Sequence, residues 1–315
     1  MLPGWFGSLT APGSQGIHLA SLGPAPGPGL ARRPWASCPT PLVPTKMTAN
    51  GTIAGKIFGM SKLLQGKTAI VLGVWNKWSI AYAIAQAFAR EGAKLLLTYQ
   101  NERAKPAVEE LGRELGATGF FPCEVQEQDD IDHLAEGLRS AGHTLDVVVH
   151  SLAAAKHEEL NQPFLQTSRE GFQLALDISA YSLVAISKAL SPLMTNGGAI
   201  ITLTYLGSTR VVTNYNIMGV AKAALEAEVR YLASELGPNK IRVNAISAGA
   251  IKTISARGVK DLSKMLEISA QRAPLRRNTE TAEVADTAVF LGSDLGRGVT
   301  GNVVYVDAGF HIMGL

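Results

Sequence analysis

A tyrosine and a lysine seven positions apart are the residues of this sequence best suited to chemistry. If the segment around 215–236 is one helix, Tyr215 and Lys222 lie two turns apart on a shared face. A phenol beside an ammonium group can donate a proton and stabilise an oxyanion, and the ammonium can also hold a sugar hydroxyl. The same spacing taken alone is more often an ordinary helix face. Whether this spacing indicates a function depends on the structural elements around it.

Short apolar runs alternate with helical patterns after about residue 61. The patterns predict strands at 68–72, 94–99, 119–122, 145–150, 199–204, 241–246 and 303–306, and helices at 79–91, 102–115, 129–140 and 215–236. This alternation predicts an α/β fold, a Rossmann-like doubly wound parallel sheet in a single domain. Ligands of such a sheet bind beyond the carboxyl ends of its strands.

The first 60 residues have a different composition. They are rich in Gly, Pro, Ser and Ala, and show neither strand nor helix periodicity. Such a composition does not repay the entropy of ordering. We interpret residues 1–60 as a disordered or mis-assigned N-terminal extension, with Met47 or Met60 as the natural start, and 61–315 as the folded domain. An organelle transit peptide is the alternative, disfavoured by few arginines and many prolines.

Composition excludes several classes of protein. The formal net charge is +3, and no block of Lys and Arg interleaved with aromatic residues provides a surface for nucleic acid. The two cysteines and six histidines form no cluster at metal-ligand spacing. Because no uninterrupted apolar run reaches about 18 residues, we expect no membrane span. These features favour a cytoplasmic protein that binds a small molecule.

Two turns are suited to a dinucleotide. The turn 73–80 follows the first strand, where backbone N–H groups at a helix N-terminus can hold a pyrophosphate. Only Gly73 remains from the usual glycine fingerprint, and Ser79 can cap the helix, so an ordinary strand-to-helix turn is an equal alternative. Gln100 ends the second strand, where it can bind ribose without favouring a 2′-phosphate. This favours NADH over NADPH.

The wider context of Tyr215 resembles the bacterial enoyl-acyl carrier protein reductases, a divergent branch of the short-chain dehydrogenases. The similarity runs from about Leu64 to the C-terminus. Most members of the wider superfamily have the tyrosine four positions before the lysine, where this chain has Met218, whereas the enoyl reductases have it where Tyr215 stands. The other matching segments are 79–81, 98–101, 150–153, 177–182, 244–249 and 306–309.

The resemblance implies a reaction and a set of site residues. Hydride passes from NADH to the β-carbon of an enoyl thioester in fatty-acid synthesis, Tyr215 hydrogen-bonds the resulting enolate oxygen, Lys222 holds the nicotinamide ribose, and Tyr205 lines the site in an undecided role. The implied cofactor-binding residues are Gly73, Ser79, Ile80, Gln100, Val125, Ser151, Ala153, Lys222, Ile251 and Thr253. The implied substrate-binding residues are Ala154, Tyr205, Tyr215, Met218, Ile254 and Ala256.

The resemblance also implies a substrate lid at about 251–270, a homotetramer, and a substrate linked to acyl carrier protein. Basic residues that could contact this acidic carrier are Lys252, Arg257, Lys260, Lys264, Arg276 and Arg277, although a solvated surface explains them equally well. Glu124 departs from the family pattern, which more often has Asp beside the adenine. We interpret His150 and Asp307 as structural rather than catalytic residues.

Two alternatives remain open. The first is a short-chain dehydrogenase of the same fold that acts on a carbonyl, which Met218 disfavours. The second is a non-catalytic dinucleotide-binding regulatory protein, which would bind the cofactor without turnover. The presence of Tyr205, Tyr215 and Lys222 together argues against it.

Overall fold

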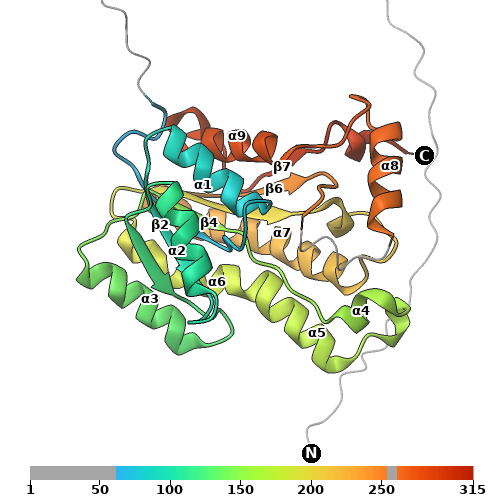
Figure 1. The fold of residues 1–315 in the computed structure, drawn as a ribbon, viewed down its shortest axis with the longest axis horizontal. Helices are drawn as coiled ribbons and strands as arrows, with labels where there is room; N and C mark the ends of the chain where they lie inside the picture. Colours follow the sequence, from blue (N-terminus) through green and yellow to red (C-terminus); the bar gives the residue numbers. More distant parts are fainter. Residues whose placement is uncertain (1–61, 254–260, 315) are drawn as a thin grey trace, which may run out of the picture. The chain divides into compact units, whose positions relative to one another are not determined.

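Parallel strands form one sheet in the order β3-β2-β1-β4-β5-β6-β7 in the computed structural model, which describes residues 62–253 and 261–314 (Figure 1). The order reverses between β1 and β4, as in doubly wound dinucleotide-binding folds, so the predicted fold class is confirmed. The strands are β1 Thr68–Leu72, β2 Lys94–Tyr99, β3 Gly119–Pro122, β4 Val147–His150, β5 Gly198–Thr204, β6 Ile241–Ala248 and β7 Val303–Val306.

Helices cover both faces of the sheet. One hydrophobic cluster joins the sheet to α1 (Ile80–Arg90), α2 (Lys105–Glu114) and α9 (Thr281–Gly292). A second cluster on the opposite face joins it to α3 (Gln128–Ser140), α6 (Ser182–Leu190) and α7 (Ile217–Leu236). Successive residues of β1 enter opposite clusters, which is why the central strands are apolar throughout rather than alternating.

The region between β4 and β5 is helical, and the sequence analysis predicted no element there. It contains α4 (His157–Asn161), α5 (Arg169–Leu176), a π-helical turn at Asp177–Tyr181, and α6. The helical run Arg169–Leu193 is long and apolar enough to cross a membrane by length and composition, but half of an 18-residue apolar stretch within it is buried inside the protein. Because it packs against α3 and α7, its apolar character serves the core.

The long helix α7 begins two residues later than predicted. It starts at Ile217 and is preceded by Asn216, with φ 43° and ψ −122°, a backbone conformation that cannot continue into the preceding residue as helix. Tyr215 therefore lies in the loop before α7. The expectation that Tyr215 and Lys222 share a helical face is wrong, and the loop sets the position of the phenol.

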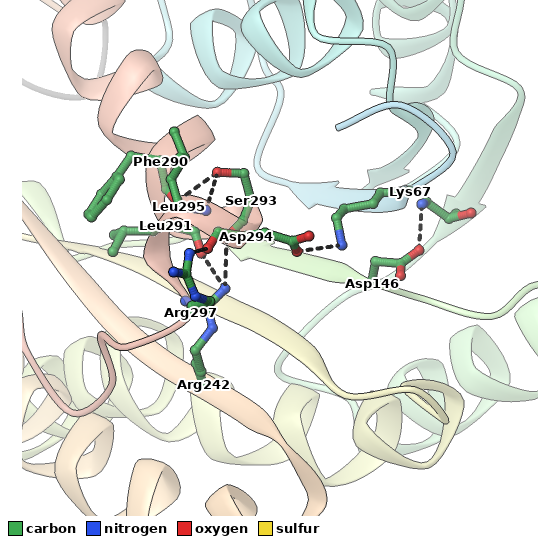
Figure 2. Close-up of polar contacts among 10 residues, drawn as sticks. Lys67, Asp146, Arg242, Phe290, Leu291, Ser293, Asp294, Leu295 and Arg297 are labelled. Carbon is green, nitrogen blue, oxygen red and sulfur yellow. Dashed lines mark hydrogen bonds and ion pairs between the residues drawn. The ribbon is translucent and has the colours of Figure 1, made fainter. Parts of the chain in front are cut away.

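At the amino end of β6, a half-buried arginine closes the end of α9 (Figure 2). The Arg242 guanidinium donates to the Leu291 carbonyl at 2.6 Å, with longer contacts to the carbonyls of Ser293 and Val299. The last carbonyls of a helix have no intrahelical donor. The Arg242 guanidinium supplies the hydrogen bond that the buried Leu291 carbonyl would otherwise lack. Burial lowers the pKa of Arg242, and Asp294 partly opposes that shift.

Replacing Arg242 by leucine is expected to destabilise the fold without changing the site at the opposite edge of the sheet. The buried carbonyl of Leu291 would lose its donor, at a cost of about 1–3 kcal/mol. Chemical denaturation measures this loss. Arg297 is the matched control, because it is exposed and, within the part of the chain that the structure describes, donates to the Asp294 carbonyl three positions away. Equal unfolding midpoints for Arg242→Leu and Arg297→Leu would refute the helix-closing role.

Candidate active site

The turns that follow β1, β2, β4, β5 and β6 bring most of the predicted site residues to one edge of the sheet. Because all strands are parallel, their carboxyl ends meet there. The residues that follow these five strands are Gly73, Gln100, Ser151, Tyr205 and Gly249. The fold thus brings together residues that are spread over nearly 180 positions of the sequence.

The turn after β1 approaches the turn after β4 at van der Waals distance. Gly73 has φ +95°, and a Cβ there would lie 2.1 Å from the Ser151 carbonyl oxygen, so only glycine fits. Ser79 caps α1: its hydroxyl accepts from the Tyr82 N–H at 3.1 Å and donates to the Asn76 carbonyl. The predicted cap is confirmed. The first N–H groups of α1 point to the same edge, as an anionic pyrophosphate requires.

The ends of β2 and β3 form an acidic, polar corner. Gln100 donates through Nε2 to the Glu124 carboxylate at 2.5 Å. The Glu124 N–H donates to Asp130 at 3.1 Å, and the adjacent Val125 is buried. Glu124 thus links the end of β3 to the end of β2. Two carboxylates near this corner oppose a 2′-phosphate by charge repulsion, which supports the preference for NADH.

Two tyrosine rings lie in contact at the end of β5. The Tyr205 and Tyr215 ring centroids are 4.9 Å apart with an interplanar angle of 67°. Tyr215 also packs on Gly207, where a Cβ would lie 2.4 Å from its ring. Burial raises the pKa of both phenols. Both hydroxyls therefore stay protonated near neutral pH and are available as hydrogen-bond donors.

Lys222 is a buried cation on α7. Its Nζ donates to the Leu203 carbonyl at 2.9 Å, and its side chain is almost fully enclosed. Burial lowers the pKa of Lys222 to about 8, although Glu226 and Glu228 partly oppose the shift. Within the described residues the ammonium donates to one acceptor, and an ammonium has three N–H donors. The other donors fit the hydroxyls of a ribose.

This pKa predicts that NADH binding weakens as pH rises through about 8. Cofactor hydroxyls and phosphates favour the ammonium form, which is lost above that pKa. The stability effect has the opposite sign. The folded-state pKa lies below the unfolded value, so the penalty for the buried charge is fully present below about 8 and is relieved as pH rises towards the unfolded pKa. Fluorescence titration of NADH across this pH range tests the predicted loss of NADH affinity. A flat affinity profile would contradict it.

The predicted substrate side lies beside the π-helical turn. The Ala154 N–H donates to the Ser179 hydroxyl at 3.0 Å, and that hydroxyl lies 3.8 Å from the Met218 sulfur. Ala154, Met218 and Ser179 thus form one wall. Ser179 belongs to a segment that the resemblance included, but nothing in the sequence gave it a role. The remaining substrate residues Ile254 and Ala256 lie outside the described residues.

The end of β6 completes the predicted cofactor set. Ile251 packs on the hydrophobic cluster that contains α1 and α9, and the Thr253 N–H donates to the Ile251 carbonyl at 2.9 Å. Ala153 is exposed in the turn after β4. The predicted lid at 251–270 is only partly described, since residues 254–260 fall outside the described ranges. Its later part begins the helix α8 (Leu262–Arg272), and closure over substrate stays a prediction.

His150 and Asp307 have structural surroundings, as predicted. His150 is fully buried, with Ser182 Oγ 2.8 Å from Nε2 and Thr202 Oγ1 3.0 Å from Nδ1. Burial, with a smaller contribution from Lys222, lowers the pKa of His150 to about 3, so the ring stays neutral. The Asp307 carboxylate accepts from the N–H groups of Gly309 and His311 and so fixes the turn after β7.

The sheet order, the dinucleotide-binding turns and the Tyr215 and Lys222 pair define a reductase of the short-chain dehydrogenase type. Comparisons with known proteins define the branch. The profile of the enoyl-(acyl carrier protein) reductase family matches residues 73–311. The chain belongs to this family.

Individual relatives agree with the family match. The chain is 51% identical to the NADH-dependent enoyl-acyl-carrier-protein reductase FabI of Bacillus cereus over 80% of this chain and all of the relative. It is 47% identical to the protein of the same name from Escherichia coli, over 79% of this chain and 95% of the relative.

Solved structures are similar in fold and sequence. One is the enoyl-acyl carrier protein reductase of Bacillus cereus with NADP+ and indole naphthyridinone, at a TM-score of 0.79 and 51% identity, covering 81% of this chain and all of that one. Another is the reductase of Anaplasma phagocytophilum with NAD, at a TM-score of 0.79 and 43% identity, covering 81% of this chain and 97% of that one.

Proposed function

We propose that this chain is an NADH-dependent enoyl-acyl carrier protein reductase that reduces the double bond of a trans-2-enoyl thioester in fatty-acid synthesis. The contact between the Tyr205 and Tyr215 rings, whose centroids are 4.9 Å apart, carries the proposal. It brings two protonated phenols together at the carboxyl ends of the strands. The position four before Lys222 holds Met218, whose buried side chain has no acidic proton. The tyrosine arrangement therefore favours an enoyl over a carbonyl substrate.

The residues of the chain orient the reactants and stabilise charge. When bound, the reduced nicotinamide supplies the hydride. Gly73 and the start of α1 fit its pyrophosphate, Gln100 its adenosine ribose and Lys222 its nicotinamide ribose. As the β-carbon gains a hydride, negative charge develops on the thioester oxygen. The Tyr215 hydroxyl donates a hydrogen bond to that oxygen, and the buried Lys222 ammonium keeps the local potential positive.

The first experiment follows NADH absorbance with a short trans-2-enoyl thioester, then with NADPH and with a 3-oxoacyl thioester. Oxidation of NADH with the enoyl substrate alone would support the proposal. Oxidation with the oxoacyl substrate alone would favour a carbonyl reductase. If neither substrate is reduced while NADH still binds, the chain is a non-catalytic binding protein.

We also propose a homotetramer in the cytoplasm and a substrate delivered on acyl carrier protein, in line with the family. Of the basic residues weighed for the carrier, Arg277 is engaged by the Glu283 carboxylate through both terminal nitrogens at 2.8 and 2.6 Å. Lys252 and Lys264 are exposed, which makes them better candidates for a carrier contact. Comparing kcat/KM for carrier-linked and coenzyme A-linked substrates in Lys264→Ala tests the carrier contact. Sedimentation tests the tetramer.

The boundary of the domain stays a proposal as well. A chain that begins at Met60 should keep the activity of the full sequence, because the family similarity begins after that point. Loss of activity in the shortened chain would mean that residues 1–59 contribute to folding or to the site.

A further inference from the structure

The loop before α7 holds Tyr215 between two asparagines with positive φ. Asn214 has φ 65° and Asn216 has φ 43° with ψ −122°. Asparagine tolerates a positive φ better than most residues, but the φ and ψ of Asn216 together lie outside the usual left-handed region, so its surroundings must hold that backbone. The contacts of Asn216 should therefore show what fixes the residue next to the phenol.

The Asn216 side chain joins the loop to α4. Its Nδ2 donates to the carbonyl of Gln162 at 2.9 Å and to that of Glu159 at 3.2 Å. Both partners are carbonyl oxygens, so only the amide nitrogen can face them. These acceptors lie at the C-terminal end of α4, where helix carbonyls have no intrahelical donor. Helices α4 and α7 are direct neighbours (Figure 1).

Helix α4 is itself held firmly by a buried carboxylate. Glu159 accepts from the hydroxyl of Ser168 at 2.5 Å and from the Gln162 amide at 2.8 Å. The Ser168 hydroxyl in this contact lowers the pKa of the Glu159 carboxyl, so the group stays ionised. The start of α5 closes over it, because a Cβ at Gly171 would lie 2.2 Å from Glu159 Oε1. Helix α4 is thus anchored to α5 and offers fixed carbonyls to Asn216.

We propose that Asn216 is a positioning residue for Tyr215. Its amide ties the backbone immediately after the phenol to the anchored end of α4, while Gly207 and Tyr205 contact the ring itself. Together these contacts hold the Tyr215 hydroxyl where charge develops on the substrate oxygen. The inference rests on the proposed reductase function, and it assigns to Asn216 no contact with substrate or cofactor.

Two substitutions separate the effect of losing the amide donor from the effect of the unusual backbone conformation. Asn216→Asp keeps the shape and tolerates positive φ but cannot donate to the carbonyls, and Asn216→Gly relieves the backbone and also removes the donor. For both variants we expect kcat with the enoyl thioester to fall by about 10-fold to 100-fold, with the KM for NADH unchanged. Asn161→Asp is the matched control, because that exposed amide donates within α4, to the His157 carbonyl at 2.7 Å.

Wild-type kcat in Asn216→Gly would overturn the positioning role, since the backbone alone would then suffice. A parallel fall in kcat and loss of NADH binding would also overturn it, because that pattern indicates general misfolding. Failure of the proposed function itself is distinguishable. In that case the wild-type chain would not reduce the enoyl thioester, whereas failure of the inference leaves wild-type turnover intact.

Discussion

Lys222→Met is expected to abolish NADH-dependent turnover and NADH-induced thermal stabilisation, while the free protein remains folded. The ammonium is buried and donates to the Leu203 carbonyl, and we propose that its remaining donors hold the nicotinamide ribose. Removing a buried cation also removes its desolvation cost, so an apolar side chain of similar length need not lower the stability of the free protein. Thermal unfolding with and without NADH measures both effects.

The exposed Lys188 on α6 provides the matched control for this substitution. Lys188→Met should retain the full NADH-induced shift in unfolding temperature. If Lys222→Met also retained this shift, Lys222 would have no part in holding the cofactor. If it unfolded at a much lower temperature without NADH, the ammonium would have a structural role that outweighs its burial cost.

Tyr215→Phe is expected to lower kcat about 100-fold or more, the size of effect seen when one donor to a developing oxyanion is removed. The KM for NADH should stay unchanged, because the phenol contacts Tyr205 and Gly207 rather than the cofactor turns. The ring and its packing are preserved, so unfolding temperature should change little. Steady-state kinetics with an enoyl thioester gives the comparison.

Tyr231→Phe controls for loss of a hydroxyl, since Tyr231 lies on α7 with 78% of its surface exposed. Its kinetics should match wild type. Undiminished kcat in Tyr215→Phe would show that another group donates to the substrate oxygen, and Tyr205 is the neighbour in ring contact. A Tyr205→Phe variant then reports whether that second phenol replaces the first.

Much of this protein follows directly from sequence pattern. The predicted bounds of β1, β2, β3 and β7 match the observed ones. The run at β1 is apolar because a central parallel strand must bury both faces, whereas β3 and β7 are the edge strands of the sheet and are only partly buried. The cap at Ser79 and the glycine at 73 were likewise recognisable, since each depends on local backbone requirements. The spacing of Tyr215 and Lys222, with Met218 between them, resembles that of the enoyl reductases, and this resemblance favoured an enoyl over a carbonyl substrate.

Tertiary structure alone decided how those residues meet. Periodicity placed Tyr215 on a helix, but contacts between Asn216 and α4, a segment more than 50 positions away in sequence, hold it in a loop. The link between Gln100 and Glu124 joins two strand ends, and Ser179 reaches Met218 from a π-helical turn. Hydrogen bonds between distant segments leave no periodic trace in a sequence. The sequence therefore determined the fold and its chemical groups, and long-range packing determined their geometry.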